Sequence, residues 1–233
     1  MYSYVRNNPL RLIDPTGMYV CNGTESQCKD FEKQRQEALK SKNSDVRAGA
    51  SSYGGVGNDN GVAVRFGDPG KGKAGTATAS LGIDPNDSSK FRANVDVVIK
   101  TGQSGVSLRD TIAHEGTHVR DAQAFAATAT MDGQYDLSRN LTSWQTEMNA
   151  YAVSAAVLSE AGKTAQMGAC GGGPCTFGPG MSAAQVRGTT MILLANPANG
   201  YNRFIDTGGS FPFVNQLGMR QFPAITTPAP PKP

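Results

Sequence analysis

The sequence predicts an α+β fold in which a small antiparallel sheet is followed by two helices. Residues 61–100 contain three runs typical of strands, VAVRF, TATASLGI and RANVDVVIK, and the turn sequences GDPGKGKAG and DPNDSS separate them. Residues 107–128 and 143–160 have the pattern of helices. A Ser107-x-x-Asp110 capping box is expected to open the first of these two helices.

Length and composition describe one loop-rich globular unit with loose ends. The chain has 233 residues, of which 38% are hydrophobic and 18% charged, with 28 glycines and 13 prolines. Its 22 basic and 19 acidic residues leave a net charge of +3, which is too small to indicate a nucleic acid or a membrane surface as partner. The chain lacks an apolar run of roughly 18 residues and the plan of a signal peptide, so we expect another carrier if it is exported.

The remaining segments predict short helices and irregular connections. Residues 30–42 are typical of a charged, exposed helix, and residues 183–196 of a further helix. The glycine-rich stretch 168–180 predicts a long irregular loop, and residues 223–233 a disordered, proline-rich tail. Gly116 costs its helix about 1 kcal/mol of propensity relative to alanine, so we expect another segment to pack closely against it.

The four cysteines form two close pairs, Cys21 with Cys28 and Cys170 with Cys175. One interpretation is a disulfide bond within each pair. The other is four free thiols that serve as small apolar side chains in a reducing compartment, and the sequence leaves both open. Neither spacing matches the CxxC pair of a zinc site.

The stretch TIAHEGTHVRDA contains both histidines of the chain, four residues apart. On a helix, His114 and His118 project from the same face about one turn apart, so both imidazoles can reach one metal ion. Glu115 projects to one side of this pair, where it can meet a water on the metal instead of the metal itself. We interpret the pattern as an H-E-x-x-H zinc site with Glu115 as general base, the alternative being a chance match on an amphipathic helix.

A catalytic zinc takes three protein ligands, and without a third histidine the third must be a carboxylate or a cysteine. Glu147 is the first choice, because it lies on a strip of the second helix that is expected to face the first: Glu147, Ala150, Tyr151, Ser154 and Leu158. Asp121 is the alternative, but it lies about 10 Å along the helix axis from His114, which suits a supporting role better. Asp110 precedes His114 by four residues and can orient its imidazole, although the predicted capping role already accounts for it.

The order H-E-x-x-H, an intervening loop and then a glutamate on a later helix resembles the gluzincin metallopeptidases. The E-x-x-A-Y form around Glu147 is similar to that of metallopeptidase-like toxin domains. The resemblance implies a zincin-like fold and one zinc ion per chain, held by His114, His118 and Glu147. Glu115 is then expected to take a proton from the attacking water and to pass it to the leaving amine.

Peptide hydrolysis needs two further features that the sequence can suggest. The developing oxyanion requires a donor besides zinc, for which Tyr151 is the first candidate and Arg187, Tyr201 and Arg203 are weaker ones. The strand at residues 92–100, directly before the zinc helix, is either an edge strand that holds an extended substrate or an interior strand.

The N-terminal stretch YSYVRNNPLRLIDPTGM predicts two turns, and it resembles the junction that ends the shell of rearrangement-hotspot (Rhs, YD-repeat) proteins. In that family the shell cleaves itself after a D-P-x-G-L motif, and a variable C-terminal toxin domain follows. The resemblance implies a self-cleavage motif of Asp14, Pro15, Gly17 and Met18, in which Met18 replaces the usual leucine and the cut follows it. Residues 1–18 are then the end of the shell, 19–222 the toxin domain and 223–233 the tail.

These features together predict a zinc-dependent endopeptidase that acts as a secreted effector toxin of an Rhs system, for example through type VI secretion. The resemblance implies delivery into a target cell, with the cytoplasm as the favoured compartment. It also implies three partners: a protein or peptide substrate, a cognate immunity protein, and the shell of the same parent chain. Two alternatives remain, a zinc amidohydrolase acting on cell-wall or other amides, and a non-catalytic, zinc-stabilised module that sequesters its target. Glu115 discriminates against the second, because a structural zinc site needs no general base.

Overall fold

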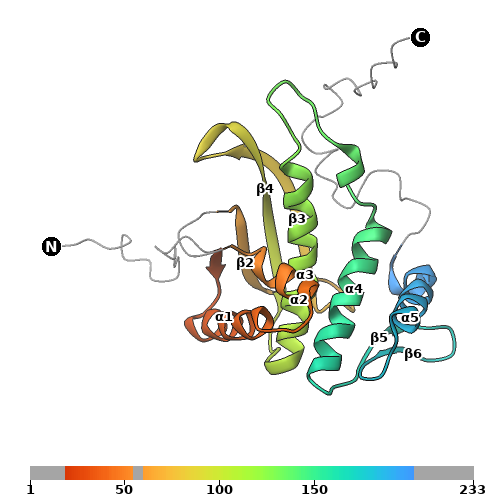
Figure 1. Ribbon diagram of the computed structural model, residues 1–233. Helices are drawn as coiled ribbons and strands as arrows, with labels where there is room; N and C mark the ends of the chain where they lie inside the picture. The colour runs from red at the N-terminus through yellow and green to blue at the C-terminus, as the bar shows by residue number, and fades with distance from the viewer. Residues whose placement is uncertain (1–18, 55–59, 202–233) are drawn as a thin grey trace, which may run out of the picture.

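The computed structural model describes residues 19–54 and 60–201 of the chain (Figure 1). They form a mixed α and β structure with a four-stranded sheet, a separate two-stranded hairpin and five α-helices. The elements are β1 Val20–Asn22, α1 Glu25–Leu39, α2 Ser44–Ser51, β2 Val62–Gly67, β3 Gly75–Asp84, β4 Asp87–Lys100, α3 Gly105–Ala126, α4 Ser143–Glu160, β5 Ala165–Ala169, β6 Pro174–Phe177 and α5 Ala183–Ala195, with 3₁₀ turns η2 Leu137–Arg139 and η3 Pro197–Asn199. The predicted tail and the proposed self-cleavage motif lie outside the described residues.

The main sheet is mixed, so the prediction of an antiparallel sheet is wrong in part. Its strand order is β1-β2-β4-β3, in which β1 and β2 are parallel, β2 and β4 are parallel, and β3 and β4 are antiparallel. The reason is topological: α1 and α2 carry the chain back between β1 and β2, and β4 inserts between β2 and β3. The strand at residues 92–100 is therefore interior, and β3 forms the edge on that side of the sheet.

Helix α3 lies between the sheet and α4, and it is covered by neighbours on nearly every side (Figure 1). Its apolar side chains Leu108, Ile112 and Val119 join Val95, Val97 and Ile99 of β4 in the largest core cluster. Its opposite face, which carries the two histidines, packs against α4. A helix enclosed in this way keeps a fixed position, so the groups it carries are held rigidly.

The close neighbour expected at Gly116 is α2. A Cβ on Gly116 would lie 2.2 Å from the backbone oxygen of Gly49, and a Cβ on Gly49 would lie 2.7 Å from the backbone oxygen of Ala113. The two backbones approach closely because neither position carries a side chain. Ser52, just after α2, donates a hydrogen bond to the Gly116 carbonyl at 2.7 Å and ties the two helices together.

The predicted starts of two helices, α1 and α3, are wrong. The first helix begins at Glu25, five residues before the expected start, and buries Phe31 and Arg35 instead of lying exposed. Helix α3 begins at Gly105 after Ser104, so the predicted capping box at Ser107 falls inside the helix and is wrong. The predicted bounds of α4 are confirmed at both ends. Its start is fixed by a capping box that Thr142 and Gln145 form.

The glycine-rich stretch near the C-terminal end of the described chain differs from the long irregular loop that was predicted. The stretch 168–180 contains most of an antiparallel β5–β6 hairpin and is not wholly irregular. Asn199 holds this hairpin, since its side chain accepts from the backbone N–H of Ala169 at 2.7 Å and donates to the Ala169 carbonyl at 2.9 Å. The hairpin and α5 form a second cluster with Tyr151 and Leu158 of α4.

Both cysteine pairs are disulfide bonds, Cys21–Cys28 and Cys170–Cys175. The first joins β1 to α1, and the second closes the β5–β6 hairpin. Disulfides persist in oxidising compartments, which is evidence for a secreted or extracellular protein. None of the helices in residues 19–54 and 60–201 is long and apolar enough to cross a membrane.

The Gly49–Gly116 contact makes a prediction about stability. Gly116→Ala is expected to destabilise the fold by about 1–3 kcal/mol, because overpacking outweighs the gain of about 1 kcal/mol in helix propensity. Gly188→Ala is the matched control: Gly188 lies inside α5 with open space around its Cβ position, so the same change should stabilise slightly. Chemical unfolding of both variants measures the difference, and equal effects would contradict the close-packing account.

Candidate metal centre

The two histidines of α3 and Glu147 of α4 converge across the interface between the helices. Nε2 of His114 lies 3.5 Å from Oε2 of Glu147, and Nε2 of His118 lies 3.7 Å from Oε1. One donor atom from each residue lies within 4.8 Å of the other two, so the three form a group that can hold a metal ion. The predicted carboxylate is therefore the one that meets the histidine pair.

The three side chains are largely withdrawn from solvent. Their exposed fractions are 15% for His114, 10% for His118 and 19% for Glu147. Within the described part of the chain, Oε2 of Glu147 is buried without a hydrogen-bond partner. A buried carboxylate oxygen without a donor is costly, and a cation between the three residues would satisfy it.

Local sequence explains how α4 presents Glu147. The Thr142–Gln145 capping box fixes the start of the helix, which sets the rotation of every later residue. Thr146, Ala150, Tyr151 and Ser154 are all buried on the side that carries Glu147. Small side chains at two of these positions let α4 approach α3 closely.

The other nitrogen of each imidazole contacts a hydroxyl group of α4. Nδ1 of His118 lies 3.0 Å from Oγ1 of Thr146, and Nδ1 of His114 lies 3.1 Å from Oγ of Ser154. Sequence reasoning placed Ser154 on the correct strip but gave it no role, and it missed Thr146. Hydroxyl residues on an otherwise apolar helix face are the signal that could have found them.

Each of these hydroxyls also contacts a carboxylate of α3. Thr146 donates to Oδ2 of Asp121 at 2.8 Å, and the Ser154 hydroxyl lies close enough to Asp110 to lower the pKa of its carboxyl group. Asp121 is thus a supporting group and not part of the ligand cluster, as its position along the helix predicted. Asp110 does not cap the helix: it is buried near His114, where burial raises the pKa of its carboxyl group.

The charges of the cluster shift its pKa values in different directions. Burial lowers the pKa of His118, whereas at His114 the neighbouring carboxylates of Glu147 and Glu115 outweigh the effect of burial and raise the pKa to about 9. Burial alone would raise the pKa of Glu147, but the two histidines outweigh it and the pKa is lowered. Glu147 is therefore held as a carboxylate, the form that binds a metal ion.

Glu115 lies beside the cluster and faces the sheet. Its side chain is 4% exposed, and burial raises its pKa to about 7. It packs on the first residue of the edge strand β3, where a Cβ on Gly75 would lie 2.7 Å from its Oε1. Lys73, exposed in the turn before β3, contributes a positive charge that acts on both Glu115 and Glu147. The sequence contained no signal for Lys73, because only the fold brings its turn to the histidine helix.

Two tyrosines close the other side of the cluster. The ring of Tyr151 contacts His114 edge-on at 5.0 Å between centroids, and its hydroxyl lies 2.9 Å from that of Tyr201. Burial raises the pKa of both phenols, so both stay protonated and can act as donors. Tyr201, a weaker sequence candidate, therefore reaches the cluster through Tyr151, which is the one of the two that contacts His114.

The remaining candidates for an oxyanion donor are not brought to the cluster. Arg187 is exposed and lines a hollow of about 630 Å³ between α4 and α5. None of the residues that line this hollow belongs to the histidine and glutamate cluster. Arg203 lies outside the described residues.

Comparison of the chain with protein-family models, with curated proteins and with solved structures gives no match. Any assignment of function therefore depends on the residues and their geometry.

The geometry predicts unequal effects on metal affinity for the two carboxylates. Glu147→Ala should weaken binding at least 100-fold, because it removes one of three direct ligands. Asp121→Ala should weaken it about tenfold or less, since it removes only a partner of Thr146. Calorimetric titration with Zn²⁺ measures both values, and the reverse order would exclude Glu147 as the third ligand.

Proposed function

We propose that this chain is a zinc-dependent endopeptidase with a zincin-like arrangement of His114, His118 and Glu147, and that it acts as the toxin domain of an Rhs effector. The observation that carries the enzymatic part is the convergence of these three residues, with Glu115 beside them and outside the ligand cluster. A site that served structure alone would not require a buried carboxylate next to the first histidine.

The donor atoms lie close enough together to share one ion, for which we propose zinc. Zinc lies about 2.0–2.2 Å from histidine nitrogen and carboxylate oxygen, so two ligands at tetrahedral angles are roughly 3.3–3.6 Å apart. The two nitrogen-to-oxygen distances, 3.5 Å to Oε2 and 3.7 Å to Oε1 of Glu147, are close to this range, and the three donor atoms all lie within 4.8 Å of one another. Three protein residues would hold the ion, which is the number of protein ligands in catalytic zinc sites.

The chemistry follows from what zinc supplies and from what the surrounding side chains do. Bound zinc lowers the pKa of a coordinated water toward 7 and polarises a carbonyl group. Glu115 accepts the proton of the attacking water and passes it to the nitrogen of the leaving group. Of the paired hydroxyls of Tyr151 and Tyr201, the one whose proton is not donated to the other can donate to the oxygen on which negative charge develops.

The open edge of β3 favours a peptide substrate over other amides. In the part of the chain that the structure describes, β3 pairs with β4 alone, so its outer edge offers backbone N–H and C=O groups. Gly75 at the start of β3 contacts Glu115. An extended peptide that pairs with this edge would pass beside the general base, and this pairing does not depend on the peptide's side chains.

The biological setting is proposed from the N-terminal sequence and the disulfides. The stretch that ends in Asp14-Pro15-Thr16-Gly17-Met18 resembles an Rhs shell junction, which implies release of the toxin from the shell and control by an immunity protein. The two disulfides are typical of a protein that meets an oxidising compartment. Delivery into the target cytoplasm remains a prediction that the disulfides do not favour.

Substitution of Glu115 tests the catalytic role. Glu115→Gln should keep one zinc per chain and the same unfolding midpoint, yet lose at least 100-fold in cleavage rate, because an amide keeps the shape but accepts no proton. Glu37→Gln, the same change at a half-buried position of α1 far from the cluster in sequence, where Glu37 pairs with Lys40, is the control. The measurement is mass-spectrometric analysis of an unstructured peptide library incubated with the zinc-loaded chain, together with growth of cells that express each variant.

Two results of that experiment would redirect the assignment. Cleavage and toxicity retained in Glu115→Gln would contradict the role of Glu115 as general base. A wild-type chain that binds zinc and leaves every peptide intact would instead support the amidohydrolase or the sequestering module.

The proposed release site can be tested on the native parent protein. The released toxin is expected to begin at Tyr19, whose ring is buried against Phe31 and Tyr53 and whose hydroxyl donates to Glu32 at 3.0 Å. A cut after Met18 therefore leaves the folded body intact. Intact-mass analysis of the released product measures its start, and a start beyond Cys28 would contradict the prediction.

A further inference from the structure

We infer that Thr146 is a positioning residue that fixes the tautomer and orientation of His118, so that Nε2 presents its lone pair toward Glu147. This inference rests on the proposed metal centre but not on peptide hydrolysis. Thr146 contacts both His118, at 3.0 Å, and Asp121, at 2.8 Å, and it is 3% exposed. It is thus the middle member of a buried carboxylate, hydroxyl and imidazole chain.

The direction of the hydrogen bonds follows from a count of protons. A threonine hydroxyl has one proton to donate, and the carboxylate of Asp121 can only accept. The Thr146 proton is therefore committed to Asp121, and toward His118 the hydroxyl oxygen can only accept. Nδ1 of His118 must then carry the ring proton, which leaves Nε2 of the neutral ring without one. That is the nitrogen that faces Glu147.

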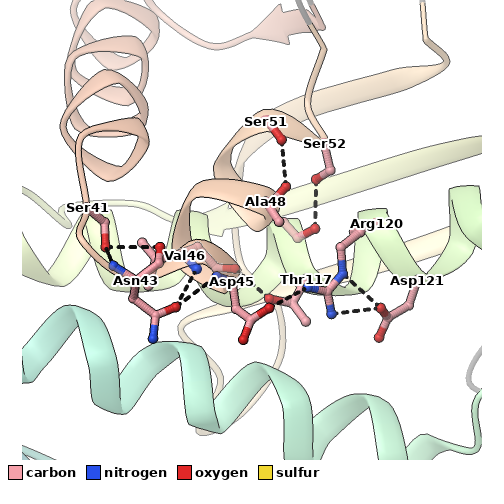
Figure 2. A network of polar contacts seen from close by, with 12 residues as sticks. Ser41, Asn43, Asp45, Val46, Ala48, Ser51, Ser52, Thr117, Arg120 and Asp121 are labelled. Carbon is pink, nitrogen blue, oxygen red and sulfur yellow. Dashed lines mark hydrogen bonds and ion pairs between the residues drawn. The ribbon is translucent and has the colours of Figure 1, made fainter.

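Arg120 pairs with the Asp121 carboxylate and leaves one of its oxygens to Thr146. Its guanidinium donates twice to Oδ1 of Asp121, at 3.1 and 3.2 Å, while Oδ2 remains for Thr146. Arg120 also lies 3.6 Å from Asp45 of α2, so it stands between two carboxylates (Figure 2). The polar chain accordingly runs from α2 through Arg120, Asp121 and Thr146 to His118.

The His114 side of the cluster provides an internal comparison. Ser154 contacts His114 and Asp110 in the same order, but Oδ1 of Asp110 has no hydrogen-bond partner in the part of the chain that the structure describes. The count of protons that fixes the direction of the hydrogen bonds at Thr146 therefore does not fix the direction of the bond between Ser154 and His114. Thr146 is the residue to test first.

The first experiment measures zinc affinity of full-length variants by calorimetry. Thr146→Val keeps the shape of the side chain and removes the hydroxyl, so affinity should fall 10-fold to 100-fold. Thr146→Ser keeps the hydroxyl and should bind within about threefold of the wild type. Thr190→Val is the matched control, because Thr190 is equally buried but its hydroxyl bonds the backbone carbonyl of Val186 in α5. It should leave affinity unchanged and report the stability cost of the substitution itself.

A double-mutant cycle shows whether Asp121 acts through Thr146. If it does, Asp121→Ala should weaken zinc binding little further once Thr146→Val is present, because the chain is already broken. Ser154→Ala belongs to the other imidazole, so its effect should multiply with that of Thr146→Val. Multiplicative loss for Asp121 and Thr146 would show that the two act independently and would overturn the chain.

The tautomer can be observed directly, since the chain has only two histidines to assign. Nitrogen-15 NMR of the neutral rings should show Nδ1–H on His118 in the wild type and in Thr146→Ser, and a shift toward Nε2–H in Thr146→Val. A bare Nδ1 in the wild type overturns the inference, as does zinc affinity in Thr146→Val equal to that of the wild type. If the wild type binds no zinc, the proposed function fails while the NMR result still decides the tautomer.

Discussion

Burial of the Glu147 carboxylate between two imidazoles is the interaction on which the packing of α3 against α4 depends. An isolated charge in that interface would be strongly unfavourable, so the surrounding groups must compensate for it. The imidazole Nε2 atoms face it at 3.5 and 3.7 Å, and a cation between the three residues would neutralise the charge. The other nitrogens of both rings are engaged by hydroxyls of the same helix that supplies the carboxylate. One short helix face thus provides the anion and the groups that orient its partners. The sheet and α2 contribute by fixing α3, and Gly49 and Gly116 set the distance between α2 and α3.

The segments after α4 form a second support for the same cluster. The disulfide closes the β5–β6 hairpin, and Asn199 bonds both backbone groups of Ala169 in that hairpin. Tyr201 follows Asn199 by two residues, so this contact places its hydroxyl against that of Tyr151. Tyr151 in turn stacks on Phe177 of β6 at 5.6 Å. The position of the phenols therefore depends on a part of the chain that is distant in sequence from the histidines.

The features that the sequence predicted well are those that depend on local pattern. The spacing of His114 and His118 and the bounds of the helix at residues 143–160 are short-range signals, and Glu147 followed from its place on an otherwise small and apolar strip of that helix. Strand pairing could not be derived in this way, because the parallel neighbours of β2 depend on where α1, α2 and β4 lie in space. The Ser107 cap failed because a plausible motif one turn inside a helix looks the same in sequence as one at its start. Gly116 predicted a close neighbour correctly, but only the structure identifies it as α2.

The position of the ligands on two helices, with the 3₁₀ turn η2 between them, has a thermodynamic consequence. An ion bound by both helices is released when they separate, so the folded state and the free ion concentration are linked. At a free concentration 100 times the dissociation constant, such linkage adds about 2.7 kcal/mol to the free energy of unfolding. With the proposed ion, the same chain is easier to unfold where the ion is scarce than where it is abundant. The supply of that ion would then set how long the chain survives proteases, which attack its unfolded form.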